Sequence, residues 1–146
     1  MAYRTIILKG DPVIGDVVGS GAITPGDLLN IDSAGAVLRH ATAGGTAYPM
    51  FALEDENQGK SIDDVYTTAN IVRYGIFRPG DEVVVNIADG ETIAIGDFLE
   101  SAGDGALREV DADASYGAIG VQSVVAQALE ALSPSGADGT IKARVV

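Results

Sequence analysis

The amino-acid sequence predicts an all-β protein with mainly antiparallel strands, folded as a small β-barrel or β-sandwich with an internal pseudo-repeat and few or no helices. The run Glu82–Ile87 alternates between two faces, which is the period of a strand. Turn signals are dense, because glycine provides 19 of the 146 residues, well above its usual share of about 7%. A Gly-Asp pair in similar apolar surroundings occurs at Gly26-Asp27 and again at Gly96-Asp97. Many short strands between such turns are typical of barrels and sandwiches.

The two Gly-Asp pairs belong to a repeat with a spacing of about seventy residues. Ile23–Leu29 and Ile93–Leu99 both place an apolar residue before the Gly-Asp pair and two bulky apolar residues after it. Further matching positions are Gly35 with Gly105 and Tyr48 with Tyr116. A repeat of this length is a half-domain rather than a solenoid unit. We therefore expect a single β domain at 22–146, made of two similar halves at about 22–77 and 92–146 that are joined by a hairpin at 78–91, after an N-terminal strand or arm at 1–21.

The first half of the chain is predicted to form a series of short strands. Residues 3–8 form the first, and Lys9–Pro12 ends it. Residues 13–21 are either an ordinary edge strand, which is favoured, or an extended arm lying on a neighbouring chain. A hairpin is expected from strands 28–31 and 37–39 around a turn at 32–35, followed by strands at 48–53 and 71–77. Ser61 as a cap, with Asp64 three residues later, predicts one helical turn over 61–66.

The second half is predicted in the same way, starting from the alternating strand 82–87. A turn signal at Asp89-Gly90 follows, then a strand after the second Gly-Asp pair and a turn at 102–105. We expect a strand at 119–125 and a last strand at 141–146. Residues 126–132 stay open between a strand and a short helix, because they include several helix formers and no glycine.

Length and composition limit the classes of protein to which the chain can belong. With 146 residues, 47% of them apolar, it is long enough for one domain with a real core. The absence of cysteine excludes disulfides and thiolate metal sites. A formal net charge of −12 argues against binding nucleic acid through its phosphates and against anionic membranes. No apolar run is long enough for a signal peptide or a membrane span, so the protein is expected to stay in the cytoplasm that makes it unless it is assembled into something.

The sequence offers no recognisable catalytic centre. His40 is the only histidine, and neither a Gly-x-Ser-x-Gly elbow nor a phosphate-binding loop is present. The remaining candidates for chemistry are carboxylates, at Glu54–Glu56 and at Asp111 with Asp113. The second pair has the spacing of a calcium loop but lacks the glycine and the glutamate of such a loop. Solvated acidic loops are the favoured interpretation. We therefore expect no catalytic residue, no cofactor and no metal, with Ca²⁺ binding by these loops left open.

Five segments give the chain a resemblance to a known family. They are Ile23–Leu29, Phe51–Glu54, Ile93–Leu99, Ala118–Val121 and Ile141–Val146. With its Gly-Asp turns, acidic composition and valine-rich C-terminal strand, the sequence resembles capsid decoration, or cement, proteins of tailed bacteriophages. The resemblance implies a β-rich, non-enzymatic virion protein, usually an oligomer, that binds the major capsid protein on the outside of the assembled head and stabilises it. No catalytic residue is carried over. The chain differs from the best-known small decoration proteins in its clear internal repeat.

Two other functions also fit the residues. One alternative is another virion component, such as a tail or fibre-base module. The other is a β-barrel enzyme or small-ligand-binding protein that uses acidic residues, which would show carboxylates with shifted pKa values converging in a cleft.

A one-domain protein that holds a capsid together must touch several capsid subunits, which needs an oligomer or a bridging arm. We therefore expect a homo-oligomer, with a trimer favoured, that makes its contacts through the apolar N-terminal segment. The candidate interface residues are Ile6, Ile7, Leu8, Val13, Ile14, Val17 and Val18.

Overall fold

The computed structural model describes residues 3–110 and 124–146, and within them every regular element except one is a β-strand. The strands are β1 (Ile7–Lys9), β2 (Val13–Val18), β3 (Leu29–Ile31), β4 (Val37–Arg39), β5 (Met50–Ala52), β6 (Ile71–Ile76), β7 (Glu82–Ile87), β8 (Phe98–Ser101), β9 (Leu107–Glu109), β10 (Ala126–Ala128) and β11 (Gly139–Val145). The exception is η1 (Glu56–Gln58), a single 3₁₀ turn. The prediction of an all-β fold is confirmed.

The second half of the chain forms a closed five-stranded barrel. Its strands pair antiparallel in the order β7-β11-β10-β8-β9. One parallel contact, between Ile87 of β7 and Leu107 of β9, closes the ring. β1 pairs with the beginning of β7, opposite Glu82 and Val83. All six residues of β7 are buried, because the barrel interior covers one face of this strand and the rest of the chain covers the other.

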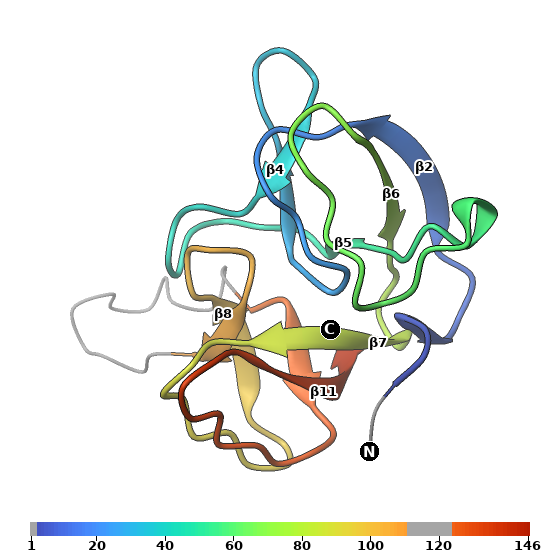
Figure 1. Cartoon of the computed structure of the whole chain (residues 1–146). Coiled ribbons are helices and arrows are strands. Elements are labelled where there is room, and N and C mark those ends of the chain that lie inside the picture. The colour runs from blue at the N-terminus through green and yellow to red at the C-terminus, as the bar shows by residue number, and fades with distance from the viewer. Residues whose placement is uncertain (1–2, 111–123) are drawn as a thin grey trace.

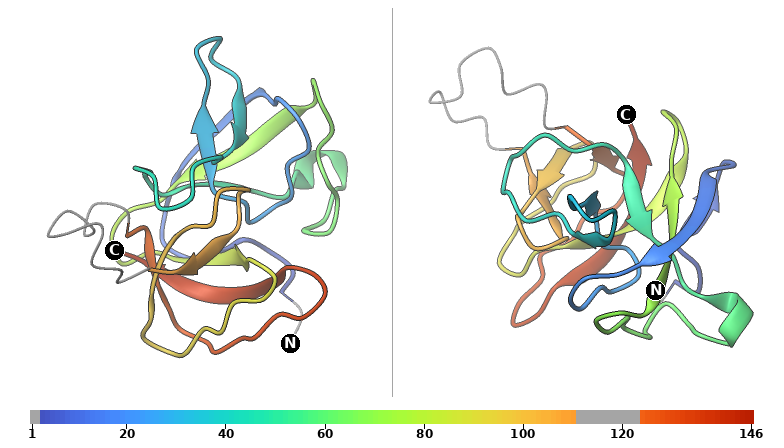
Figure 2. Two further views of the ribbon diagram at one scale, coloured as in Figure 1. Left: turned by 90° about the vertical axis from the view of Figure 1, so that its left-hand side faces the viewer. Right: turned by 90° about the horizontal axis from the view of Figure 1, so that it is seen from above.

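The first half has the same strand order with looser pairing. β2, β6 and β5 form one sheet, and β3 and β4 form the hairpin that the sequence predicts. Isolated bridges join the two, because Leu28 pairs with Phe51, and Gly19 pairs in parallel with Val37. The ring β2-β6-β5-β3-β4 is therefore the counterpart of β7-β11-β10-β8-β9, with one parallel contact at the same place. The two rings lie one above the other in Figure 1, and the side view in Figure 2 shows the same arrangement.

The pairing registers determine which residues correspond in the two rings. At the parallel contacts, Gly19 takes the place of Ile87, and Val37 that of Leu107. The matching units begin at β2 and β7, so they span 13–77 and 82–146 rather than 22–77 and 92–146. The expected boundaries leave β2 in the N-terminal strand or arm and β7 in the joining hairpin, whereas the registers pair each as the first strand of its ring.

Three turns of one design connect the strands. The N–H of the aspartate donates to the carbonyl three residues earlier, at 2.9 Å in Thr24–Asp27, 3.0 Å in Arg78–Asp81 and 3.2 Å in Ala94–Asp97. The aspartate carboxylate accepts the N–H of the first residue of each turn, at 2.8, 2.9 and 2.7 Å. The glycine in between has φ of +94, +97 and +96°. Such values belong to the third residue of a type II turn, where glycine is preferred because it lacks a Cβ.

The core consists of two clusters of buried side chains. The larger cluster fills the barrel and also contains Leu28, Phe51, Leu53 and Phe77 from the first half. The rings of Phe51 and Phe77 meet edge to face, with their centroids 5.8 Å apart. The smaller cluster lies inside the first ring and includes Ile23 together with Leu29, Val37, Met50, Ala52, Tyr66 and Val72. Since side chains of the first half complete the cluster of the second, the two halves pack as one unit.

One local prediction is corrected, and another lies mostly outside the described residues. Residues 61–66 form no helical turn. Asp64 does accept hydrogen bonds from the N–H and hydroxyl of Ser61, at 2.6 and 3.0 Å, but Tyr66 then pairs with Ile23 as a β-bridge. The strand expected at 119–125 falls mostly outside the described ranges, which stop at 110 and resume at 124. The open segment 126–132 contains the strand β10 and a bridge from Leu132 to Ile93.

Candidate interaction surfaces

The N-terminal candidates for an interface pack against the body of their own chain. Ile6 is fully buried in the larger cluster, and Ile7 and Leu8 pack against it. The carboxylate of Glu54 holds this segment by accepting hydrogen bonds from the Ile6 N–H, at 3.0 Å, and from the Thr5 hydroxyl. The segment is therefore a strand of the body of the protein, and the side chain of Ile6 has no surface to offer a partner.

The other four candidates lie on β2, which is an edge strand of the sheet β2-β6-β5. Val17 packs against the smaller cluster, whereas Val13, Ile14 and Val18 are exposed. Val18 lies opposite Ile71 of β6, which is also exposed. The outer face of this strand pair thus presents apolar side chains to solvent. Their role at an interface stays a prediction.

Sequence reasoning missed a second exposed apolar site, at the second Gly-Asp turn. Pro25 and Leu28 flank the glycine and aspartate of the first turn and are buried. Ile95 and Phe98 flank those of the second turn and are exposed. The signal that could have found them is the repeat itself, since a position that is apolar in both copies need not be covered in both.

The first Gly-Asp turn contacts the barrel through polar groups. The side-chain amide of Asn86, on β7, donates to Oδ1 of Asp27 at 2.8 Å and to the carbonyl of Pro25 at 3.2 Å. A cleft of about 320 Å³ opens beside these contacts. Its walls are formed by Tyr3, Thr24, Pro25, Asp27, Arg39, Ile62, Asp63, Asn86, Asp138 and Thr140.

Asp27 has the electrostatic property expected of an enzyme or ligand site. Burial raises its pKa to about 6, although hydrogen bonds from Thr24 and Asn86 act in the opposite direction. Both of its oxygens are occupied, because Oδ2 accepts the Thr24 N–H and Oδ1 accepts the Asn86 amide. Asp81 and Asp97 make the same turn bond elsewhere in the chain. The turn therefore explains why an aspartate stands here, and the contact between the halves explains its burial.

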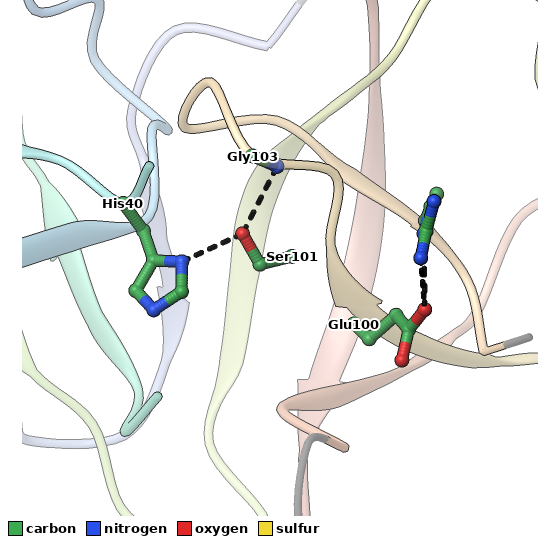
Figure 3. A network of polar contacts seen from close by, with 5 residues as sticks. His40, Glu100, Ser101 and Gly103 are labelled. Atoms are coloured by element: carbon green, nitrogen blue, oxygen red, sulfur yellow. Dashed lines mark hydrogen bonds and ion pairs between the residues drawn. The ribbon is translucent and has the colours of Figure 1, made fainter. Parts of the chain in front are cut away.

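His40 forms a second polar link between the halves. Its Nδ1 lies 2.7 Å from Oγ of Ser101, and its Nε2 lies 3.0 Å from the carbonyl oxygen of Thr46. Since a carbonyl only accepts, Nε2 donates to Thr46. The Ser101 oxygen also accepts the Gly103 N–H at 3.1 Å (Figure 3). Ser101 is fully buried, so this histidine and serine join the two rings and present no nucleophile at the surface.

Of the acidic residues proposed for chemistry, Glu54 has a structural partner, and Glu100, which was not among them, has one as well. Glu54 holds the N-terminal strand, and Glu100 forms an ion pair with Arg108 at 2.9 Å (Figure 3). No group of three or more histidine, aspartate or glutamate side chains within 3–110 and 124–146 is placed to hold a metal ion. Asp111, Asp113 and Tyr116 lie outside these ranges. Among the described residues, no helix has the length and apolar character that crossing a membrane requires.

Comparisons with known proteins identify the fold. No protein-family model and no curated protein matches the sequence. The structure resembles a phage head-fiber base. This neighbour is the head fiber gp8.5 N base of bacteriophage phi29, known from a crystal structure, with a TM-score of 0.58 and 13% sequence identity. The match covers 92% of this chain and 93% of that chain, so the two share a fold over almost their whole lengths.

Proposed function

We propose that this chain is a non-enzymatic structural protein of a tailed-bacteriophage virion, which sits on the outer surface of the head and stabilises it as a decoration or cement protein. The observation that carries the proposal is the fold shared with the phi29 head fiber base over 92% of the chain. The resemblance of the Gly-Asp segments to decoration proteins supports the same location.

The use of polar side chains supports a structural role. The buried carboxylate of Asp27 closes a turn, and His40 and Ser101 bond to each other across the two halves. A hydrolytic or acid–base site would be built from groups of this kind. Here their hydrogen bonds stabilise the turn and the contact between the rings.

Charge supports the outside of the head over the inside. Packaged DNA is a dense polyanion, and a protein with a net charge of −12 is repelled by it. The partner on the outside is the major capsid protein, with no nucleic acid or membrane contact. The protein is made in the host cytoplasm and is incorporated from there.

A fibre-base module is a second candidate, because the structural neighbour is itself the base of a head fiber. Both functions place the chain on the head, and they differ in what it does there. A decoration protein strengthens the shell, whereas a base connects the shell to a further structure.

Deletion of the coding sequence from the virus that carries it distinguishes these functions. Mass spectrometry of purified wild-type particles should find the protein, and antibodies against it should label their heads. Particles made without it should lose their DNA at lower temperature if the protein is a cement, and re-addition of purified protein should restore the wild-type temperature. Unchanged particle stability together with loss of a fibre would favour the base module. Absence from purified particles would contradict both candidates.

A further inference from the structure

The contact between the two halves uses a different face of each ring. Face A is the surface that the first ring turns toward the second, and it contains Pro25, Leu28 and Phe77, all buried. Face B is the surface that the second ring turns toward the first, and it contains Asn86 and Ser101, also buried. Hydrogen bonds from Asn86 to Pro25 and between Ser101 and His40 show that these two faces meet.

Because the rings repeat, each carries a copy of both faces, and within residues 3–110 and 124–146 one copy of each is left uncovered. The counterparts of Pro25, Leu28 and Phe77 in the second ring are Ile95, Phe98 and Val146. These are 71%, 49% and 46% exposed. The second ring therefore has an open face A.

The first ring has an open face B. In the first ring Val18 pairs with Ile71, and in the second ring Asn86 pairs with Thr140 at the same place. In the same way, the pair of Ile31 and Val37 corresponds to the pair of Ser101 and Leu107. The counterparts of Asn86, Ser101 and Thr140 are thus Val18, Ile31 and Ile71, which are 40%, 47% and 54% exposed. Asn86 and Ser101, the polar side chains that meet the first ring, are replaced in the first ring by the apolar Val18 and Ile31. Thr140 is itself exposed, and its counterpart Ile71 lies beside Val18.

The two open faces account for six of the ten large apolar side chains that are exposed within the described part of the chain. Clustering of exposed apolar side chains marks surfaces that are covered in the working state. On open face B, Ile71 of β6 lies beside Val18 of β2. On open face A, Ile95 and Phe98 lie on one turn. Each face is therefore a local patch rather than a set of scattered residues.

We infer that a second copy of this chain covers these faces head to tail, with face A of the second ring of one copy seated on face B of the first ring of the next. The occupant is a second copy because the chain already joins these two kinds of face inside itself. This contact is heterologous, so it closes into a ring of copies or continues as a filament. It does not depend on the proposed attachment to a phage head.

The negative charge of the chain sets the conditions under which the contact is seen. Two copies with a net charge of −12 each repel one another. Salt limits the range of this repulsion to about 10 Å, and to a few ångströms at high concentration. Apolar burial is not weakened by such screening. Association should therefore become stronger as the salt concentration rises, which separates this contact from one built on ion pairs.

Two single variants test the contact from its two sides. Val18→Asp places a charge on open face B, and Phe98→Asp places one on open face A. Val65→Asp is the matched control, since Val65 is exposed and lies on neither face. In analytical ultracentrifugation at raised salt and protein concentrations, wild type and Val65→Asp should sediment as oligomers and the two face variants as monomers. Circular dichroism and thermal melts check that all variants are folded. If Val18→Asp does not fold, Ile71→Asp replaces it on face B, and if Phe98→Asp does not fold, Ile95→Asp replaces it on face A.

Mixing the two face variants gives the decisive result. Phe98→Asp keeps an intact open face B and Val18→Asp keeps an intact open face A, so an equimolar mixture should form a one-to-one dimer and nothing larger. A wild-type chain that remains monomeric, face variants that assemble like wild type, or a mixture that stays monomeric would each overturn the inference. The last outcome would mean that both faces take part in one twofold contact.

Cysteine cross-linking provides a second readout that does not need a stable oligomer. The natural chain has no cysteine, so the double variant Val18→Cys with Ile95→Cys introduces one thiol on each open face. Oxidation should give a ladder of disulfide-linked multimers on a non-reducing gel. The reason is that Asn86, the counterpart of Val18, contacts Pro25, the counterpart of Ile95, inside the chain. Val65→Cys with Ile95→Cys should remain monomeric. Equal ladders from both pairs would contradict the head-to-tail contact.

Discussion

The glycine of each Gly-Asp turn has a backbone conformation that other residues adopt only at a cost in free energy. Gly26 and Gly96 have φ near +95°, but their surroundings differ. A Cβ at position 26 would lie 3.1 Å from Oδ1 of Asn86, whereas one at position 96 would meet nothing within 4 Å. The two positions therefore separate backbone strain from packing at the contact between the halves.

We predict that Gly96→Ala lowers the free energy of unfolding by about 1–2 kcal/mol through strain alone. Gly26→Ala should cost more, because Asn86 must also move away from its bonds to Pro25 and Asp27. Urea denaturation of both variants measures the difference. Equal losses would show that the contact at Asn86 gives way freely, and no loss at either position would contradict the turn geometry.

Asp27 makes the stability of the protein depend on pH in an unusual direction. Burial raises its pKa from 3.8 to about 6, so the folded protein binds a proton that the unfolded chain releases between these two pH values. The stabilisation from Asp27 is fully present below about pH 4 and is lost as pH rises through 6. The expected loss is of the order of 2–3 kcal/mol.

Denaturant unfolding at several pH values between 4 and 7 tests this dependence, with Asp27→Asn as the comparison. The wild-type free energy of unfolding should fall over this range, and the curve of the variant should be flatter because position 27 no longer titrates. An NMR titration of the Asp27 carboxyl carbon gives the pKa directly. Parallel curves for the two proteins would contradict the assignment.

The N-terminal strand is an integral part of the barrel side of the molecule, which alters what truncation can test. Deletion of residues 2–20 removes both β1 and β2, each of which is paired with a strand of the body. We expect such a chain to unfold rather than to lose only an interface. Loss of head binding by this deletion would therefore say nothing about an arm.

A single substitution measures how much the N-terminal strand contributes. Ile6→Ala should lower the free energy of unfolding by about 2–4 kcal/mol, because Ile6 is fully buried and its removal leaves a cavity in the larger cluster. Val13→Ala is the control and should change stability by less than about 0.5 kcal/mol, since Val13 is exposed. Similar small effects for both variants would indicate that residues 3–9 are loosely attached.

Local patterns in the sequence predicted the elements that depend on neighbouring residues. The hairpin of β3 and β4 follows from the turn at Asp32–Gly35, and β7 from its alternation. The barrel required pairings that no local pattern specifies, above all β7 with β11, about fifty residues apart. For the same reason the segment around Ser61 was predicted as helix: its cap-like bonds form, but the distant partner Ile23 draws Tyr66 into a bridge.

The exposure of the candidate interface residues could be predicted only in part. The apolar runs at Ile6–Leu8 and Val13–Val18 look alike in the sequence, and both lie at a sheet edge, yet the first packs against the larger cluster whereas most of the second is exposed. Burial of Ile6 depends on Glu54 and on the barrel, both remote in sequence. The exposed pair Ile95 and Phe98 could be recognised only once the repeat and its internal contact were seen together.

The whole molecule should unfold in one step although it contains two rings. Leu28, Phe51, Leu53 and Phe77 of the first half lie in the cluster that fills the second, so the core of the second ring is incomplete without the first. We predict that the calorimetric and van't Hoff enthalpies of unfolding agree. Two separate transitions, or a stable fragment containing residues 82–146 alone, would contradict this coupling.

The most direct measurement of function is a cryo-electron microscopy reconstruction of virions from the virus that carries this sequence. The proposal predicts density on the outer surface of the head, in contact with the major capsid protein, into which the two-ring structure fits as a body. Density for this chain inside the shell, on the tail alone, or nowhere in the particle would contradict the proposed role at the head surface.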